Sequence, residues 1–418
     1  MSQALIILFA IINSLLIYDG LRKKSVMGVF RFPFIIACVN LTFIYPQLTA
    51  IHEYNGNPDA YMSLSLVHMC LCTIAVWSGF QLGNNHHSKI ITIRHFKTAK
   101  IIPLAVLFLV IGATAYFMNR GVYKGGKISG TYVIINFFNA YINYALVLIM
   151  IALYKPNQTT KQIAKFLLII VLIISIDQFT QQARRGSALY IALIIGYFYM
   201  LHVSLAKYKI IRFLIPGIFI FGQIFNTVIT QYRSNAYAGE LNVIDNVESL
   251  SFDDSNSLKS SATGEVNNAI LGINALSGVG IYDLGANSWN AIVATMVPKA
   301  LVGERQKEAM ILPSPNQDLV EYLTRSGSTM TGFYDSYVSF GLFGFIKFFV
   351  IAWFMGALWK KRLNNDISIF LYITLLTPGI HMITHSTNTI ISHVVIYAMI
   401  VYPVLCNISI KTKIVNQQ

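Results

Sequence analysis

An all-α protein that crosses a membrane many times is the fold class that this sequence predicts, on three observations. The chain of 418 residues is 55% hydrophobic and only 11% charged, whereas a soluble domain averages about 25% charged residues. Its mean hydropathy is +0.58. Its apolar residues gather in runs long enough to cross a bilayer, which takes about 20 residues in a helix. A soluble enzyme and a disordered chain are both excluded, because the first needs more charge and the second less hydrophobicity.

Eleven segments meet this length requirement. They are 2–18, 32–51, 61–83, 101–118, 131–153, 166–181, 187–205, 211–231, 336–359, 367–385 and 388–408. The first has no basic residues before it and no small-residue cleavage site, so we expect it to remain as a span. The predicted organisation is therefore 1–231 with eight transmembrane helices, a long loop at 232–335, and 336–418 with three more. No internal repeat is visible, which argues against a transporter built from inverted halves.

Basic residues collect in alternate loops. The net charge is +14, which in a soluble protein would suggest nucleic acid. Nineteen of the 31 basic residues lie in the loops after the odd-numbered predicted spans and in the C-terminal tail. Short cytoplasmic loops accumulate Lys and Arg. The sequence therefore predicts a membrane protein with its N-terminus outside and its C-terminus in the cytoplasm, and no nucleic-acid partner.

The long segment 232–335 lies on the outer side in this topology. It contains twelve of the 17 acidic residues. Stretches 264–277 and 283–302 have apolar residues at spacings of three and four, which predicts short amphipathic helices. Residues 251–263 are polar and read as a loose connection. We expect these helices to rest on the outer mouth of the bundle and not to form an independent domain.

No metal or cofactor site is predicted. The four cysteines lie in apolar stretches with neither disulfide nor zinc spacing. His381 and His385 are four apart on one helix face, which could suggest a metal site. No carboxylate or third histidine is near them in sequence, so a polar helix end facing the bundle interior is the favoured interpretation. The sequence has no Walker loop, GxSxG or HExxH motif.

Basic residues on the outer side point to an anionic substrate. Short outer loops normally exclude Lys and Arg. Three clusters of basic residues lie on the outer side here. Snorkelling to lipid headgroups would also explain any one of these clusters by itself. The residues are Arg120, Lys124 and Lys127 after the fourth span, Arg184 and Arg185 before the seventh, and Arg233 after the eighth. Because arginine makes paired, charge-assisted bonds to phosphate, the three clusters together predict an anionic, lipid-linked substrate.

Two ionisable residues lie inside predicted spans. Asp177 is near the outer end of the sixth span and Lys347 is in the ninth. Intramembrane ionisable residues suggest function by default. An internal salt bridge explains Asp177 equally well, and the sequence assigns no partner to Lys347.

The segment RSGSTMTGFYDSYVSFGLFG, from Arg325 to Gly344, resembles the O-antigen polymerase family. In that family a Gly/Ser/Thr-rich run precedes an acidic residue, an aromatic residue two positions later, and then Asn-Phe-Gly. The pattern is matched by Asp335, Tyr337, Phe340 and Gly341. Two positions depart from it in residue type: the acid is Asp335 where Glu is usual, and Ser339 stands where Asn is common. Two further features are similar to the family. Arg185 and the glycine after it open a predicted span, and the chain combines many spans with one long outer loop late in the sequence.

The resemblance implies a glycosyltransferase of the bacterial inner membrane, with its N-terminus in the periplasm, that polymerises oligosaccharide repeat units held on undecaprenyl diphosphate. We expect the reaction to be independent of metal, because no set of His, Cys, Asp and Glu has convincing ligand spacing. Asp335 and His385 are then the candidates to accept the proton of the attacking hydroxyl. Arg185 is the candidate to stabilise the charge of the leaving diphosphate. The candidate substrate-binding residues are Arg184, Arg233, Arg120, Lys124 and Tyr337. A carboxylate that stabilises a helix N-terminus is the structural alternative for Asp335.

Two other functions stay open at this point. An O-antigen ligase would share the architecture but transfer glycan to lipid A core. A flippase or transporter of lipid-linked glycans would be expected to have evenly sized loops and charges along several spans. The implied partners are the lipid-linked oligosaccharide and the bilayer, with a chain-length regulator protein as a further candidate.

Overall fold

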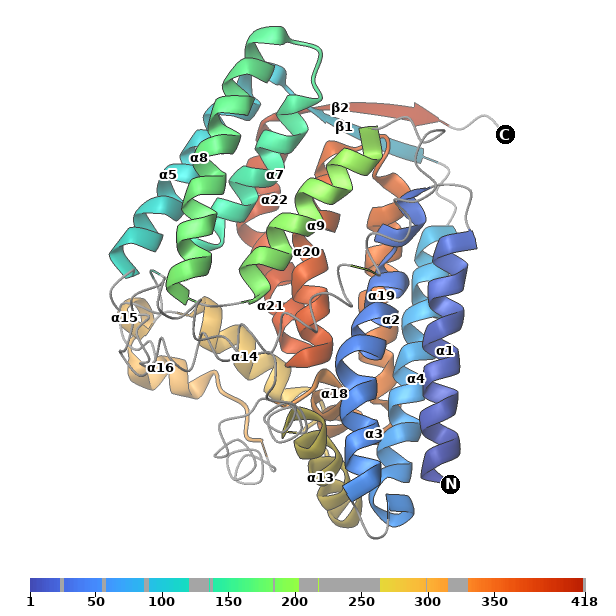
Figure 1. Ribbon diagram of the computed structural model, residues 1–418. Coiled ribbons are helices and arrows are strands. Elements are labelled where there is room, and N and C mark those ends of the chain that lie inside the picture. Colours follow the sequence, from blue (N-terminus) through green and yellow to red (C-terminus); the bar gives the residue numbers. More distant parts are fainter. Residues whose placement is uncertain are drawn as a thin grey trace, which may run out of the picture.

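The computed structural model describes residues 1–22, 26–54, 58–85, 90–119, 135, 138–182, 185–202, 217, 264–297, 299–314 and 330–415. These residues form a bundle of helices with one two-stranded sheet at one end (Figure 1). The first half contains α1 (Ser2–Arg22), α2 (Phe32–Val39), α3 (Tyr45–Tyr54), α4 (Pro58–Asn85), β1 (Ile90–Phe96), α5 (Thr98–Asn119), α7 (Tyr141–Leu153), α8 (Gln158–Gln182) and α9 (Arg185–His202). The second half contains α13 (Gly264–Val279), α14 (Ala286–Met296), α15 (Lys299–Val302), α16 (Glu304–Ala309), α18 (Gly332–Phe340), α19 (Phe345–Lys361), α20 (Asp366–Thr384), α21 (Asn388–Ile396), α22 (Tyr402–Asn407) and β2 (Ser409–Val415). Short 3-10 or π segments occur at Val26–Phe30 (η1), Asn40–Ile44 (η2), Gly341–Gly344 (η5) and Tyr397–Val401 (η6).

Within the described residues, eight helices are long and apolar enough to cross a membrane. They coincide with eight of the predicted spans. One of them joins α2 and α3 through η2, and another, Gly332–Lys361, comprises α18, η5 and α19. Two shorter apolar helices, Tyr141–Leu153 and Tyr190–His202, lie at the fifth and seventh predicted spans. The remaining prediction, 211–231, falls outside the described residues. The predicted mostly helical protein with several membrane-spanning helices is therefore confirmed.

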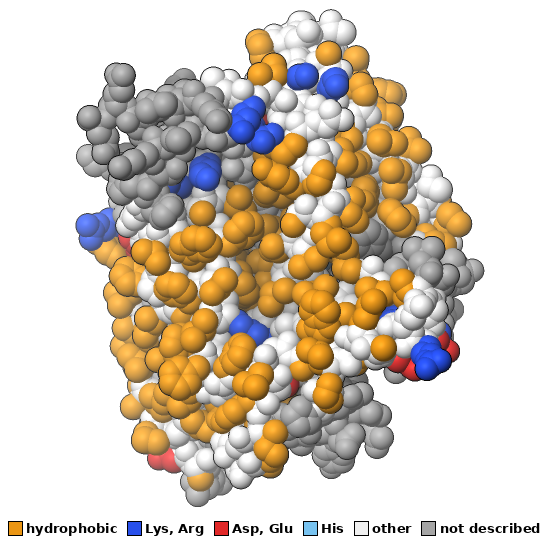
Figure 2. All heavy atoms as spheres, turned by 180° about the vertical axis from the view of Figure 1, so that it is seen from behind, with side chains coloured by type: hydrophobic (Ala, Val, Ile, Leu, Met, Phe, Trp, Pro, Cys, Tyr) orange, Lys and Arg blue, Asp and Glu red, His pale blue; other side chains and the backbone are white. Residues whose placement is uncertain are grey.

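The surface of the bundle is apolar over most of its length. Figure 2 shows one face covered largely by hydrophobic side chains, with basic side chains gathered mainly toward its edges. On α8 the isoleucines Ile169, Ile173 and Ile176 are each about 60% exposed. A soluble monomer rarely exposes so large an apolar surface, so this belt is suited to lipid.

The helices α4 and α19 pack with their backbones in close contact. A Cβ atom at Gly83 would lie 2.0 Å from the carbonyl oxygen of Trp353, and one at Gly79 would lie 2.3 Å from that of Phe349. From the other side, Gly356 meets the carbonyl of Phe80 in the same way. Gly79 and Gly83 form a GxxxG motif, which lets helix backbones approach closely in a membrane where lipid offers no hydrophobic driving force between helices.

The sheet pairs β1 with β2, which is antiparallel and places Arg94 opposite Lys411. A purely helical chain was predicted, and the sheet is the exception. Both strands lie in loops beyond the ends of predicted spans. The bundle brings these two loops together although they are more than 300 residues apart, so local pattern alone could not pair them.

Asp366 joins the sheet to the bundle. Its carboxylate accepts a hydrogen bond from the backbone nitrogen of Phe96 at 2.8 Å and forms an ion pair with Lys155 at 2.6 Å. The preceding residue, Asn365, begins α20 by accepting hydrogen bonds from the backbone nitrogens of Ile367 and Ser368. The sheet, the start of α20 and the end of α7 are thereby held at one end of the bundle. The N-terminus and helices α13–α16 lie toward the opposite end (Figure 1).

The segment 232–335 was predicted to carry helices, and α13, α14, α15 and α16 are the ones that the structure describes. The helix α13 buries one face, formed by Val266, Ile270, Ile273 and Leu276. This face packs against α4 and α18, so α13 is part of the bundle and not only a cover on its mouth. Residues 251–263, predicted to be a loose connection, lie outside the described residues.

Candidate functional site

A chain reversal divides the predicted ninth span, 336–359. The short helix α18 ends at Gly341, whose φ of +58° lies in the left-handed region that favours glycine. A side chain there would also meet the ring of Tyr282, whose nearest atom is 2.8 Å from an ideal Cβ. Immediately after the reversal, Gly344 lies against the backbone of Ser336. The start of α19 therefore packs back onto α18, and a single continuous helix over 336–359 is wrong.

This reversal brings Lys347 to Asp335. The Lys347 Nζ atom lies 3.6 Å from Asp335 Oδ2. In a continuous helix these two residues would be separated by about 18 Å along the axis, which their side chains could not bridge. The ion pair thus depends on the turn at Gly341.

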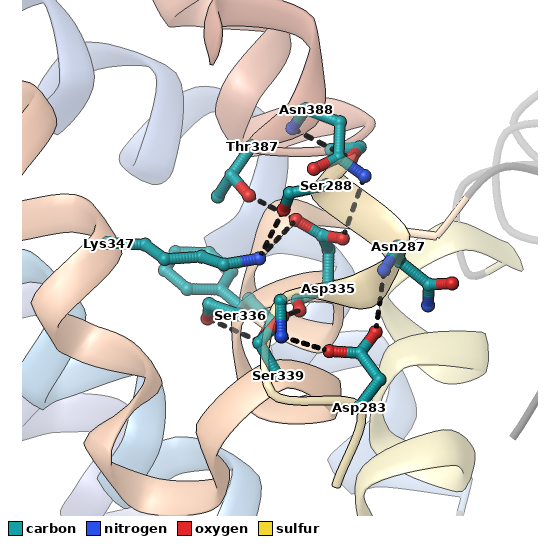
Figure 3. Close-up of polar contacts among 12 residues, drawn as sticks. Asp283, Asn287, Ser288, Asp335, Ser336, Ser339, Lys347, Thr387 and Asn388 are labelled. Atoms are coloured by element: carbon teal, nitrogen blue, oxygen red, sulfur yellow. Dashed lines mark hydrogen bonds and ion pairs between the residues drawn. The ribbon is translucent and has the colours of Figure 1, made fainter. Parts of the chain in front are cut away.

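The loop between α20 and α21 and the first residue of α21 supply the other contacts of the carboxylate (Figure 3). The Thr387 hydroxyl donates to Asp335 Oδ2, and the Asn388 amide donates to Oδ1 at 3.2 Å. Lys347 also donates to the Ser288 hydroxyl of α14 at 2.9 Å. The Asp335 carboxylate of α18 thus contacts α19, the α20–α21 loop and the start of α21, and Lys347 links it to α14.

The Asp335–Lys347 pair is largely shielded from solvent. The side chains of Lys347 and Asp335 are 9% and 11% exposed. An ion pair in such a place is costly unless further hydrogen bonds satisfy its atoms, and Thr387, Asn388 and Ser288 do so here. A carboxylate can accept about four hydrogen bonds, so Asp335 keeps capacity for a further donor.

Asp283 positions α14 and hence Ser288. Its carboxylate accepts from the backbone nitrogens of Gly285 at 2.8 Å and Asn287 at 3.3 Å (Figure 3). Its own backbone nitrogen donates to the carbonyl of Val338 in α18. This buried acid therefore caps the first turn of α14 and ties that turn to α18.

Behind Asp335, α18 is fixed to α4 by His68. The His68 Nε2 atom lies 2.9 Å from the Ser336 hydroxyl and 3.1 Å from the carbonyl of Phe333. The ring of Tyr337 meets His68 edge to face and also packs against Tyr282. His68 is completely buried. These contacts set the rotation of α18 about its axis and with it the direction of Asp335.

The structure brings only some of the predicted site residues together. His385 is exposed at the end of α20, two residues before Thr387, and its Nδ1 atom lies 2.8 Å from the Thr384 hydroxyl. The His381 and His385 rings are 5.4 Å apart. Tyr337 is buried on the other side of α18 from the carboxylate contacts, with 3% of its surface exposed. Its predicted role in binding substrate stays a prediction.

The predicted basic clusters lie almost entirely outside the described residues. Arg120, Lys124, Lys127, Arg184 and Arg233 are all in this group. Arg185 is the first residue of α9. The other intramembrane acid, Asp177, accepts a hydrogen bond from the Tyr116 hydroxyl of α5 at 2.7 Å.

Several residues of the site were not found from the sequence. His68 was missed although the sequence contains a signal for it, because a histidine inside a predicted span suggests function by default. Thr387 and Asn388 stand in the polar run HSTNT between two spans, next to His385. Ser288 and Asp283 gave no signal that separates them from other loop residues.

Among the described residues, no three His, Cys, Asp or Glu side chains lie close enough together to hold a metal ion. A reaction without metal stays a prediction. Comparison of the chain with protein-family models, with curated proteins and with solved structures gave no match. The site must therefore be interpreted from its own geometry and from the sequence.

Proposed function

We propose that the protein is a glycosyltransferase that polymerises oligosaccharide repeat units carried on undecaprenyl diphosphate, in the biosynthesis of O-antigen or a related surface polysaccharide. The observation that carries this proposal is the buried Asp335–Lys347 pair and its hydrogen-bonded neighbours. Its acid, Asp335, belongs to the segment 325–344 that resembles the O-antigen polymerase family, and Lys347 follows three residues after that segment. The chain also has the apolar helices of a membrane protein. An acid held beside several hydroxyl and amide groups suits chemistry on a sugar.

The proposed topology has eleven spans, with the N-terminus and the segment 232–335 on the periplasmic side of the bacterial inner membrane. Two findings support it. The N-terminus and α13–α16 lie toward one end of the bundle, and the C-terminal strand lies at the other (Figure 1). The second end carries Lys155, Arg94 and the last turn of α19 with Lys360 and Lys361, as expected for cytoplasmic loops.

In the proposed reaction, a hydroxyl of the acceptor sugar attacks the anomeric carbon of the donor glycan. The bond between that carbon and the diphosphate oxygen breaks, and undecaprenyl diphosphate leaves. Asp335 accepts the hydroxyl proton, with exposed His385 as the alternative acceptor. Arg185, with Arg184 and Arg233, neutralises the charge that develops on the diphosphate, and Arg120 and Lys124 contact the substrate. Asn388 and Thr387 hold the acid in place.

The topology predicts which introduced cysteines are accessible. In a background that lacks the four native cysteines, cysteines at Ser277 and Gln306 should react with an impermeant thiol reagent on intact spheroplasts. Both positions are exposed. Cysteines at Asn157 and Asn364, which are also exposed, should react only after permeabilisation. The reverse labelling pattern would exclude the orientation and the proposed periplasmic site together.

The function itself is tested by reconstitution. Purified protein in liposomes, given repeat units linked to undecaprenyl diphosphate, should form polymers that gel electrophoresis resolves as a ladder. The variant Arg184→Lys/Arg185→Lys/Arg233→Lys should be slower by about 10- to 150-fold, because one charge-assisted hydrogen bond is worth about 1.5–3 kcal/mol and lysine lacks the paired fork. Wild-type polymer length from this variant would exclude the arginines from diphosphate binding.

A deletion strain distinguishes the polymerase from the ligase. Loss of a polymerase leaves a single repeat unit on lipid A core, whereas loss of a ligase leaves lipid A core without any glycan unit. The second pattern, together with no polymer in liposomes, would contradict the proposed function.

A further inference from the structure

A groove on the bundle has no part in the site described above. Its floor is formed by α20, and its walls by α19 on one side and by α21, η6 and α22 on the other. The floor contributes Leu371 and Leu375, and the walls contribute Phe354, Leu358, Val394 and Tyr397. These helices belong to candidate membrane spans, so the groove is apolar along the part that lies within the membrane.

One end of the groove is polar and basic. Arg94 of β1, Lys361 at the end of α19, and Asn365 and Ser368 at the start of α20 line it there. No acidic side chain is among the lining residues that the structure describes. The nearest acid in sequence, Asp366, accepts hydrogen bonds from Lys155 and from the Phe96 backbone. The end of the groove is therefore net positive.

This combination matches one kind of molecule. An apolar channel within a membrane is suited to an acyl chain, because lipid is the solvent there. Two cations at the membrane surface attract an anionic headgroup, and each contributes about 1 kcal/mol near an anionic leaflet. Arginine in particular pairs with phosphate oxygens through its planar fork.

We propose that this groove binds one anionic phospholipid from the leaflet at the sheet-bearing end of the bundle. One acyl chain lies along α20, and the phosphate lies between Arg94 and Lys361. The proposal is independent of the glycosyltransferase function, because the groove is lined by no residue of the Asp335 site.

Native mass spectrometry of the purified full chain with added phosphatidylglycerol or phosphatidylcholine tests the site. The wild-type protein should retain one phosphatidylglycerol at activation energies that remove phosphatidylcholine. In Arg94→Ala/Lys361→Ala the retained fraction of phosphatidylglycerol should fall at least about fivefold. The double variant Lys100→Ala/Lys165→Ala removes the same charge from exposed positions outside the groove lining and should behave as wild type.

A groove-filling variant tests the acyl-chain part separately. Ala357→Phe places a ring among the lining residues without changing charge and should also release phosphatidylglycerol, while a single symmetric gel-filtration peak confirms folding. Equal retention of both lipids by the wild-type protein would overturn the headgroup assignment. Unchanged retention in Arg94→Ala/Lys361→Ala, or equal loss in the Lys100/Lys165 control, would overturn the site.

Discussion

Replacing Lys347 by methionine is expected to remove most of the folded protein. The substitution leaves the Asp335 carboxylate buried without its cation, and breaking a buried ion pair from one side costs about 3–5 kcal/mol. That is a large part of the stability of a typical domain, about 5–15 kcal/mol. Fluorescence-detected gel filtration of the tagged protein after mild heating should therefore show a strong loss of the monodisperse peak.

The double variant Asp335→Asn/Lys347→Met separates structure from chemistry. It removes both charges while asparagine keeps the shape of aspartate, so the folded fraction should recover relative to Lys347→Met. Polymer formation should stay low in the double variant, because removing a proton acceptor typically costs 10²–10⁴-fold in rate. A double variant that folds and polymerises at the wild-type rate would show that the pair only holds α18 and α19 together.

Adding two methyl groups at the α4–α19 crossing should be nearly as damaging. In Gly79→Ala/Gly83→Ala each new Cβ would lie less than 2.5 Å from a backbone carbonyl of α19. Overpacking typically costs about 1–3 kcal/mol per site. We expect this loss to exceed the gain of about 1 kcal/mol that alanine brings over glycine inside a helix, so the thermal midpoint should fall clearly.

Gly278 provides the matched control for this variant. It is helical, in α13, and a Cβ there would meet no atom within 4 Å. Gly278→Ala should therefore leave the thermal midpoint unchanged or raise it. If Gly278→Ala and Gly79→Ala/Gly83→Ala shifted the thermal midpoint equally, helix propensity and not the close crossing would explain the effect.

The proposed function places different demands on the acid and on the arginines. Asp335 needs a fixed direction, and His68, Thr387 and Asn388 supply it through contacts that the structure describes. The arginines need access to a diphosphate at the membrane surface, for which Arg185 at the start of α9 is suitably placed in sequence. The Arg→Lys and Asp335 variants therefore test two separate parts of the proposed site.

Composition and hydrophobic runs were sufficient to predict a mostly helical membrane protein and the positions of eight long apolar segments. An apolar run of about 20 residues in lipid forms a helix, because a helix satisfies every backbone hydrogen-bonding group within the segment. The helices at 264–277 and 283–302 were also predictable, because their apolar residues repeat at helical spacing. Asp335 could be singled out by its motif, but its neighbours could not.

Only the tertiary structure decided what Asp335 contacts. The turn at Gly341 reverses the chain and carries Lys347 back to the acid, whereas the hydrophobic pattern of 336–359 reads as one helix throughout. Thr387, Ser288 and His68 reach the site from helices and loops up to 268 residues away in sequence. The pairing of β1 with β2 has the same origin. Local patterns specify which segments are helical and which face lipid, but contacts between distant segments depend on how the whole bundle packs.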